Sequence, residues 1–193
     1  MVKKIHKVNK VINHSIKHKQ SANHPLKSYR TSKDLERVTK LGEKITPEFN
    51  YAPEILEAFT NKHPNRDAWT SLICTEFTTL CPKTGQPDFA KIFINYIADK
   101  SMVESKSLKL YLTSFRQHGH FHEDLIQIIC NDLSSLLLPR YLEVVGVFTP
   151  RGGISIFPYC NYSNNQEQYK ELKNKRLFEY IPGKYSMDLS LLY

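Results

Sequence analysis

The chain has 193 residues, 40% of them hydrophobic and 24% charged, with a formal net charge of +8 at pH 7. This length fits one domain with tails, and the composition excludes a disordered, fibrous or disulfide-stapled protein. No apolar run approaches the roughly 18 residues of a membrane span or resembles the core of a signal peptide, so we expect a cytoplasmic protein whose four cysteines are free thiols.

The positive charge is concentrated at the start of the chain. Residues 1–30 contain eight lysines and arginines, four histidines and no acidic residue, whereas the rest of the chain carries 19 basic and 19 acidic side chains. A nucleic-acid-binding domain carries its basic surface on the folded body, so we expect residues 1–30 to be a disordered leader. This leader is either a solvated tail or a weak tether for RNA or a membrane surface, which leaves an RNA-binding protein as an alternative.

Two strands are expected at the start of the body. Residues 31–68 mix proline, asparagine and charge, which indicates a lead-in segment lying over the core. Trp69–Phe77 has strand composition, and Ala90–Ile97 alternates its apolar side chains between two faces. Two prolines and a glycine in residues 81–88 predict a loop between these strands.

Two helices and two further strands follow. Glu104–Phe115 and His122–Leu137 carry apolar residues at helical spacing, which predicts two amphipathic helices. Strands are predicted at Tyr141–Phe148 and, after a glycine-containing turn, at Ile154–Tyr159. The order ββααββ predicts an α+β domain in which an antiparallel sheet has two helices on one face.

The chain is thereby divided into three regions. They are the leader over residues 1–30, a domain with its lead-in over residues 31–162, and a C-terminal extension over residues 163–193. The extension is polar except for its leucine-rich end, Leu189–Tyr193, which is suited to docking on the body or on a neighbouring subunit.

Cys81 is the candidate nucleophile, because a side chain on a proline- and glycine-rich loop at a strand end is held rigidly and reached by a ligand. A cysteine with an ordinary pKa of about 8.5 is mostly thiol at neutral pH and needs cationic or hydrogen-bonding neighbours, for which Lys83 and His122 are candidates. Asp88, at the other end of the loop, is the candidate proton donor. The alternatives are a small buried cysteine and a turn-capping aspartate.

Three histidines at a spacing of two, His118, His120 and His122, suggest a zinc site. Gly119 makes the segment irregular and no further ligand motif completes the site, so we predict no metal. Glu123 has the chemistry to accept two hydrogen bonds from a guanine-like base. Its alternative role is that of a first-turn glutamate stabilised by the helix dipole.

Two segments contain groups that bind phosphates. Glu104–Lys109 opens the first helix with hydroxyls, backbone N–H groups and cations, and Arg151–Gly153 places a cation on a flexible turn. Neither is a Gly-x-Gly-x-x-Gly or Walker A pattern, and the alternatives are a capped helix with a solvated face and an ordinary β-turn. Together the two segments have the groups to hold a dinucleotide diphosphate without a Rossmann fold.

The chain from Arg37 to Tyr162 resembles a known family. The segments that carry the resemblance are Glu76–Ala90, Val103–Leu112, Phe121–Glu123 and Pro150–Ile154. They resemble the NADPH-dependent 7-cyano-7-deazaguanine (preQ0) reductases, the nitrile reductases of queuosine biosynthesis, in their short single-repeat form. The cysteine loop and the helix sequence Val-Glu-Ser-Lys-Ser-Leu-Lys are the most specific parts of the match.

This resemblance implies a tunnelling fold, in which the sheets of several subunits join into a multimeric barrel of two stacked pentamers with active sites between protomers. It implies that preQ0 is the substrate, that NADPH is the cofactor, and that 7-aminomethyl-7-deazaguanine (preQ1) is the product of a four-electron reduction. It further implies that Cys81 forms a covalent thioimide with the nitrile and that Asp88 protonates the nitrile nitrogen. Neither a membrane nor a nucleic acid is required as a partner.

The residue roles implied by the resemblance fall into three sets. The implied catalytic residues are Cys81 and Asp88. The implied substrate-binding residues are Val103, Glu104, Ser105, His122 and Glu123. The implied cofactor-binding residues are Ser105, Lys106, Arg151 and Gly152.

Two other enzyme classes of the same superfamily remain alternatives. A zinc-dependent enzyme similar to the GTP cyclohydrolases would use the three histidines as ligands. An amidinotransferase similar to those of archaea would keep the cysteine and the aspartate without needing the segments that match NADPH binding. The intact Glu104–Lys109 segment and Arg151 favour reduction over both.

Overall fold

The computed structural model describes residues 50–182 and residue 184, which are organised around one four-stranded antiparallel sheet. The predicted leader, residues 1–30, and the leucine-rich end, Leu189–Tyr193, lie outside the described residues. Within the described part, no helix is long and apolar enough to cross a bilayer.

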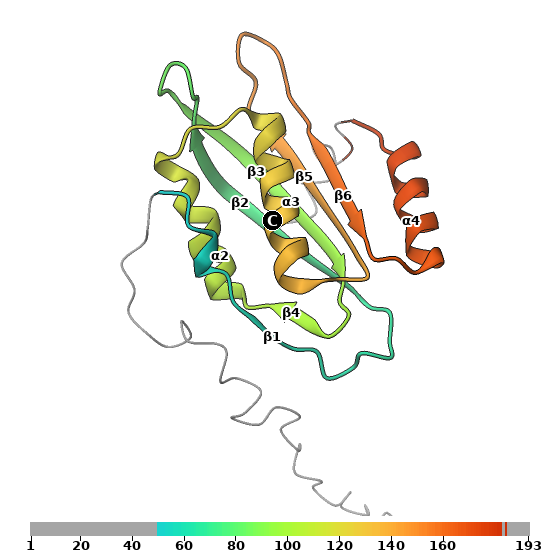
Figure 1. The fold of residues 1–193 in the computed structure, drawn as a ribbon. Coiled ribbons are helices and arrows are strands. Elements are labelled where there is room, and N and C mark those ends of the chain that lie inside the picture. The colour runs from blue at the N-terminus through green and yellow to red at the C-terminus, as the bar shows by residue number, and fades with distance from the viewer. Residues whose placement is uncertain (1–49, 183, 185–193) are drawn as a thin grey trace, which may run out of the picture.

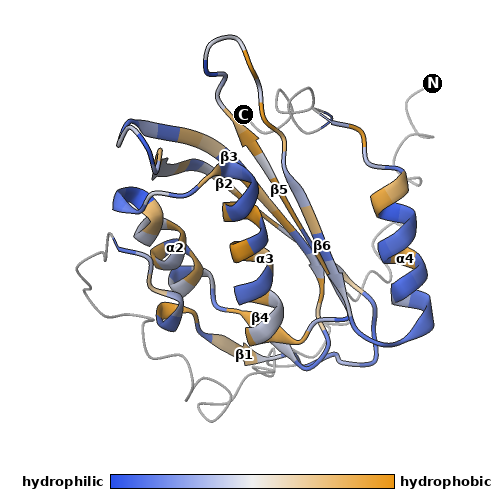
Figure 2. Cartoon of the chain, turned by 45° about the horizontal axis from the view of Figure 1, so that its top comes forward, coloured by the Kyte–Doolittle hydropathy of each residue, from blue (hydrophilic) through white to orange (hydrophobic). Residues whose placement is uncertain are grey.

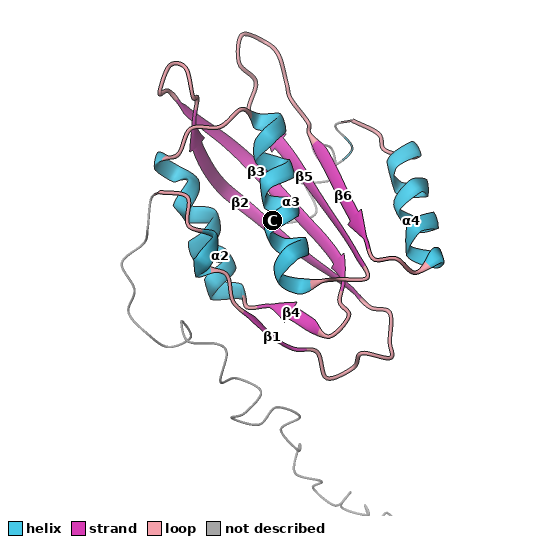
Figure 3. Ribbon diagram, in the orientation of Figure 1, coloured by secondary structure: helices cyan, strands magenta, loops and turns pink. Residues whose placement is uncertain are grey.

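The four strands follow the spatial order β2-β3-β5-β6, which leaves β2 and β6 at the edges. Their bounds are β2 Trp69–Leu80, β3 Pro87–Ile97, β5 Tyr141–Phe148 and β6 Tyr159–Ser163. The helices α2 (Ser105–Ser114) and α3 (His122–Leu137) lie side by side on one face of this sheet (Figure 1, Figure 3). The predicted α+β class is confirmed, and the main sheet with its two helices has the predicted chain order of two strands, two helices and two strands.

Shorter elements complete the fold. A second, two-stranded sheet pairs β1 with β4, and a further helix follows β6. Their bounds are η1 Pro53–Ile55, β1 Ala58–Thr60, β4 Ser101–Val103, η2 Phe115–Gln117 and α4 Glu167–Phe178.

The core lies between the sheet and the two helices. The apolar stripe predicted for α2 is buried, including Leu108 and Tyr111, and it packs in one cluster with Ile92 and Ile94 of β3. The stripe of α3 joins the same cluster, and Figure 2 shows both hydrophobic and hydrophilic faces on this helix. Because each large apolar side chain contributes about 1.5–3 kcal/mol when fully buried, these stripes hold the helices on the sheet.

The fourth strand lies later in the chain than predicted. Ile154–Tyr159 was expected to be a strand, but this expectation is wrong, since β6 runs from Tyr159 to Ser163 and pairs with β5. Residues 154–158 follow β5 as irregular chain, in which the carbonyls of Ile156 and Pro158 accept single hydrogen bonds at 3.2 and 3.0 Å. Pro158 has no N–H to donate to a ladder, so regular pairing begins only after it.

The C-terminal extension contains the helix α4, which was not predicted. Its hydropathy pattern is weak, and only Tyr169 among its residues is buried. It is held instead by Arg176, which donates to the buried Glu143 of β5 at 2.9 and 2.6 Å. Burial opposes the ionisation of Glu143, but hydrogen bonds from Arg176, Asn95 and Tyr141 outweigh it, so the pKa of Glu143 lies below its usual value.

The lead-in segment is attached to α2 where the structure describes it. The Ala52 N–H donates to the Ser114 hydroxyl at 3.2 Å, and the Glu57 N–H donates to the Ser107 hydroxyl at 3.0 Å. The Glu104 N–H donates in turn to the Glu57 carbonyl at 2.9 Å. These bonds connect residues about fifty positions apart and fix the start of α2 against the lead-in.

Candidate active site

Cys81 lies at the end of β2, on the tight loop that joins β2 to β3. The Cys81 N–H donates to the Gln86 carbonyl at 2.8 Å, and the Gly85 N–H donates to the Cys81 carbonyl at 2.9 Å. Gly85 has a φ of +65°, which glycine adopts without strain. The loop therefore closes through its own backbone and holds the thiol at its base.

The environment of Cys81 favours the thiolate. Hydrogen bonds from the hydroxyl and N–H of Thr84, the N–H of Lys83 and the guanidinium of Arg151 lower the thiol pKa to about 6. The sequence suggested Lys83 and His122 as the activating groups. Lys83 contributes through its backbone, and His122 contacts Asp88 instead. Thr84 was missed, because its role depends on how the loop closes.

Asp88 is a buried residue of β3 with only 3% of its side chain exposed. Its Oδ2 lies 3.0 Å from Nε2 of His122, and its Oδ1 pairs with Nε of Arg151. Because Arg151 also bonds the sulfur of Cys81, the structure brings the predicted nucleophile and the predicted proton donor together around one guanidinium. Asp88 is part of the strand and does not cap a turn.

His122 is the first residue of α3 and is held on two sides. Its ring stacks on Phe148 of β5 with centroids 3.9 Å apart and an interplanar angle of 10°. Its Nε2 faces Asp88, whereas Nδ1 is buried without a hydrogen-bond partner in the described part of the chain. Glu123 follows it with an exposed side chain in the first turn of α3. This places a carboxylate at the surface next to the Asp88–His122 pair.

The segment His118–Gly119–His120 holds the cysteine loop in place. The His118 carbonyl accepts from the Leu80 N–H at 3.1 Å and from the Thr79 hydroxyl at 2.6 Å. The His120 N–H donates to the Leu80 carbonyl at 3.3 Å. A Cβ on Gly119 would lie 3.1 Å from Cα of Pro82, so glycine permits this close approach. In the sequence, the imidazoles were the candidate functional groups of this segment. In the structure, its backbone positions Leu80, the residue before Cys81.

The three histidines of this segment do not converge. Nε2 of His118 lies 2.6 Å from Nε2 of His120, and burial together with His120 lowers the pKa of His118. His122 turns away toward Asp88. Among residues 50–182 and 184 there is no group of three potential ligand side chains that could hold a metal ion. The arrangement needed by a three-histidine zinc site is therefore not formed.

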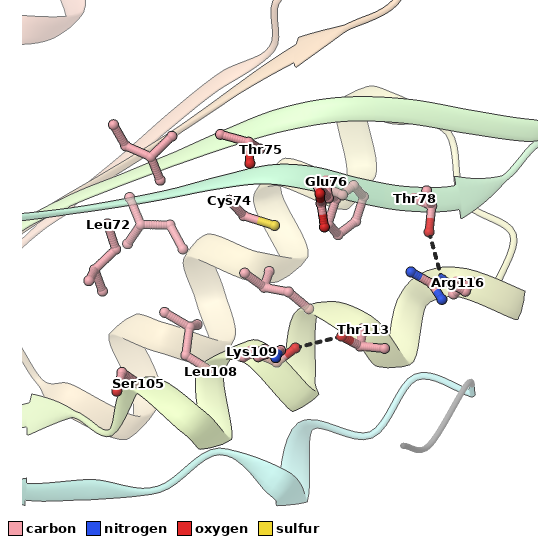
Figure 4. Close-up of a pocket in the computed structure, with 14 residues that line it drawn as sticks. Leu72, Cys74, Thr75, Glu76, Thr78, Ser105, Leu108, Lys109, Thr113 and Arg116 are labelled. Carbon is pink, nitrogen blue, oxygen red and sulfur yellow. Dashed lines mark hydrogen bonds between the residues drawn. The ribbon is translucent and has the colours of Figure 1, made fainter. Parts of the chain in front are cut away.

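The other predicted binding residues lie at the opposite end of α2. Val103 is buried in β4 and pairs with Ala58, and Ser105 is the exposed first residue of α2. Figure 4 shows Ser105 at one end of this helix and Arg116, bonded to Thr78 near the cysteine loop, at the other. Ten helical residues span about 15 Å. One chain therefore carries its predicted site residues in two separated groups, one around the cysteine loop and one at the start of α2.

Glu104 acts as the N-cap of α2. Its carboxylate accepts from the Lys106 N–H at 2.9 Å and from the Ser107 N–H at 2.6 Å, and the residue is buried. The N–H groups of Lys106 and Ser107, for which the sequence left phosphate binding and helix capping as alternatives, are therefore engaged by a capping side chain. The hydroxyl of Ser105 and the side chain of Lys106 lie at the same helix start.

Replacing Glu104 by alanine is expected to lower the free energy of unfolding by about 1–2 kcal/mol, because two helix N–H groups lose their acceptor. Urea denaturation of the variant measures this loss. Exposed Glu171 of α4 supplies the matched control, and Glu171→Ala should leave the unfolding midpoint nearly unchanged. A Glu104→Ala variant as stable as the wild type would contradict the capping role.

Two cavities open beside β2, where a bulge interrupts its pairing with β3 between Cys74 and Phe77. One has a volume of about 370 Å³ and extends along α2, with Ser105 and Arg116 in its lining. The other has a volume of about 620 Å³ and includes Phe89 and Pro150. Neither lining contains Cys81 or Asp88, so these two residues lie outside both of the cavities described.

The chain is similar to one family model and to several curated proteins. The family described as QueF-like protein matches residues 87–167. The NADPH-dependent 7-cyano-7-deazaguanine reductase of Bdellovibrio bacteriovorus is 64% identical over 169 residues, which covers 86% of this chain and 98% of the relative. The enzyme of the same name from Bacillus cytotoxicus is 59% identical over 152 residues, covering 78% and 92% of the two chains.

Among solved structures, the apo form of an archaeosine synthase QueF-Like protein is similar, with a TM-score of 0.48 and 16% sequence identity. The match covers 52% of this chain and 99% of that protein. The similarity to these two reductases extends over nearly their whole length. The chain therefore belongs to the family of NADPH-dependent 7-cyano-7-deazaguanine reductases.

Proposed function

We propose that this chain reduces the nitrile of preQ0 to the aminomethyl group of preQ1, with NADPH as the reductant, in the biosynthesis of queuosine. The observation that carries the proposal is the cysteine whose thiol pKa is about 6, joined through Arg151 to the buried carboxylate of Asp88. A soft thiolate beside a carboxyl group suits addition to a nitrile followed by protonation of its nitrogen.

The reaction assigns one role to each member of this pair. The Cys81 sulfur forms a bond to the nitrile carbon while Asp88 delivers a proton to the nitrile nitrogen, which yields a covalent thioimide. NADPH supplies the hydrides, and two hydrides with two protons convert the nitrile into the amine. The carbon–sulfur bond breaks after the first hydride has been added, so Cys81 leaves as a thiolate and the imine receives the second hydride.

Recognition of the substrate is proposed to involve the start of α3. The exposed carboxylate of Glu123 accepts two hydrogen bonds from the N–H groups of the deazaguanine ring, because a carboxylate matches this pair of donors. His122 lies next to it and is fixed by Phe148 and Asp88. Val103, Glu104 and Ser105 contribute from the start of α2, where Glu104 acts by shaping the backbone rather than through its engaged carboxylate.

The chain also has residues suited to the phosphates of NADPH. Arg151 is 37% exposed on a turn where Gly152 has a φ of +55°, and a Cβ at Gly152 would meet nothing within 4 Å. This open, cationic turn fits an approaching phosphate. Lys106 and the Ser105 hydroxyl are the corresponding groups at α2, while the helix N–H groups engaged by Glu104 do not take part. The dinucleotide therefore needs both groups of residues.

Assembly into a multimer would bring together the two groups of site residues, those around the cysteine loop and those at the start of α2. The start of α2 and the cysteine loop lie at opposite ends of this helix, and β2 is an edge strand of the sheet. We propose that sheets join edge to edge into a barrel of two stacked pentamers, so that one protomer supplies Cys81 and its neighbour supplies Ser105 and Lys106. We further place the enzyme in the cytoplasm, where its four cysteines stay reduced.

Mixing two inactive variants tests this shared site. Cys81→Ala and Lys106→Ala should each be inactive or strongly impaired alone. If the site lies between subunits, co-assembled mixtures contain interfaces with both intact halves, and activity returns toward about one quarter of the wild-type level. Native mass spectrometry gives the subunit number, and mixtures that stay inactive despite subunit exchange would contradict the shared site.

The proposed function itself is tested by following NADPH absorbance with and without preQ0. The expected result is nitrile-dependent oxidation of two NADPH per preQ0, with preQ1 identified by mass spectrometry. Folded protein that consumes no NADPH would refute the reduction. Conversion of preQ0 to an amidine when ammonia is supplied in place of NADPH would favour the amidinotransferase alternative instead.

A further inference from the structure

Cys130 and Cys160 are two thiols that the proposed reduction does not use. Cys130 lies in the middle of α3 and is buried in the core, with 2% of its surface exposed. Cys160 lies in the edge strand β6 and is half-buried, so a small oxidant can reach it. The two side chains are hydrogen-bonded to each other, although the residues are 30 positions apart in the chain. Two thiols in direct contact are the starting arrangement for a disulfide.

Strand register and helix packing explain why these two thiols meet. Tyr159 and Asn161 of β6 contact the groups that hold α4 on one face of the sheet, so Cys160, between them, points to the other face. Cys160 pairs with Val144 of β5, which is fully buried in the same core cluster as Cys130. The helix α3 packs against β6 over this face (Figure 1). The contact between the thiols is therefore built into the fold.

The two thiols differ in acidity. The hydrogen bond with Cys130, together with the positive charge of Lys173 on α4, lowers the pKa of the Cys160 thiol to about 7. The same hydrogen bond and burial raise the pKa of the Cys130 thiol. At neutral pH, Cys160 is therefore about half thiolate, whereas Cys130 stays protonated. The half-exposed thiolate is the nucleophile of the pair, and the buried thiol lies where it can attack a group formed on Cys160.

We infer that Cys130 and Cys160 form a redox-active dithiol, separate from the Cys81 site, which closes to a disulfide when the protein meets hydrogen peroxide. The Cys160 sulfur bonds to one peroxide oxygen and the oxygen–oxygen bond breaks, which leaves a sulfenic acid and releases the first water. The Cys130 sulfur then bonds to the Cys160 sulfur, and the sulfur–oxygen bond breaks with release of the second water. Two thiols and one hydrogen peroxide thus give one disulfide and two waters, and a thiol reductant reverses the change.

The disulfide links the middle of α3 covalently to the edge strand β6. It closes a loop of about 30 residues, which restricts the unfolded chain, so the oxidised protein should unfold at a higher temperature than the reduced protein. Cys130 lies eight positions after His122, about 12 Å along α3. Neither thiol therefore takes part in the proposed reduction, and the inference does not depend on the proposed function.

The experiment treats the assembled protein with hydrogen peroxide at neutral pH and then blocks the remaining thiols with N-ethylmaleimide. Mass spectrometry of the digest, without reductant, maps the cysteines. The peptides of Cys130 and Cys160 should be recovered linked, with the loss of two hydrogens, and dithiothreitol should separate them. Cys74 of β2 is the internal control, because it is also half-buried but burial raises its thiol pKa. It should be recovered as the blocked thiol.

Variants separate the roles of the two thiols. Cys130→Ser keeps the size of the side chain but removes the second sulfur, so dimedone should trap the sulfenic acid of Cys160 and no link should form. If this variant does not fold, Cys160→Ser replaces it and should leave Cys130 as a free thiol. Lys173→Ala should slow disulfide formation by about two-fold at neutral pH, because the charge that favours the thiolate is lost. Lys170→Ala changes an exposed lysine of the same helix and should match the wild type.

Thermal unfolding at one protein concentration measures the effect of the link. Peroxide should raise the unfolding temperature of the wild type but not that of Cys130→Ser, which controls for oxidation at Cys81. The inference is overturned if peroxide leaves Cys130 as a free thiol in the wild type, or if Cys160 is recovered only as a sulfinic acid or linked to a different cysteine. A wild type that carries the disulfide without unfolding at a higher temperature refutes the stabilising effect.

Discussion

Replacing Cys81 by alanine reduces preQ0-dependent NADPH oxidation to the background rate. The sulfur is the atom that we propose bonds to the nitrile carbon, and its thiol pKa of about 6 makes it largely thiolate at neutral pH. An alanine cannot form this bond. Binding of preQ0 should persist, because the groups proposed to recognise the substrate lie at the starts of α2 and α3 and are unchanged.

Mass spectrometry of the intact protein separates these two steps. Incubation with preQ0 alone should add the mass of one preQ0 molecule to the wild type and no mass to Cys81→Ala. Calorimetry should still detect binding of preQ0 to the variant. Cys74 of β2 is the matched control, because burial raises its thiol pKa and makes it a poor nucleophile. Cys74→Ala should retain the adduct. Turnover by Cys81→Ala would rule out the covalent route.

Replacing Asp88 by asparagine is expected to lower kcat by about 100- to 10,000-fold, the range over which a general acid contributes. Asparagine keeps the size of the side chain and its acceptor for Arg151, but it has no proton to deliver. The affinity for preQ0 should change much less than kcat. Steady-state kinetics together with calorimetry measure both quantities.

Asp124 provides the control for this substitution. It is an exposed carboxylate in the first turn of α3, two residues after His122, and Asp124→Asn makes the same chemical change outside the pair. Its kcat should stay within a few-fold of the wild type. Thermal unfolding of Asp88→Asn shows whether the buried substitution has disturbed the fold. A correctly folded Asp88→Asn with kcat within ten-fold of the wild type would remove Asp88 from the role of proton donor.

The regular elements were predictable where periodicity was strong. The bounds predicted for His122–Leu137 and Tyr141–Phe148 agree with those of α3 and β5, because a buried apolar stripe or a buried strand constrains each position. The prediction failed for Ile154–Tyr159, where Pro158 prevents a regular ladder. It also missed α4, which is held by the Arg176–Glu143 ion pair and leaves little apolar pattern in the sequence.

The contacts of the candidate site were less predictable than its residues. The motif identified Cys81, Asp88 and Arg151, but it did not indicate that Arg151 bonds both of the others or that Thr84 bonds the sulfur. The capping of α2 by Glu104 was only one of two alternatives in the sequence, and the structure shows that the carboxylate makes this contact. Such contacts depend on how a loop closes and on which of several possible partners a side chain binds. Neither leaves a periodic pattern in the sequence.

By itself, the sequence determined the α+β class, the family and the residue types available for chemistry, since these follow from local patterns and from motifs along the chain. Only the tertiary structure decided which of those residues meet. It placed Asp88 between His122 and Arg151, turned His118 and His120 toward each other, and separated Ser105 from the cysteine loop along α2. The physical reason is that the packing of helices on a sheet joins residues that are distant in sequence and separates others that belong to one motif.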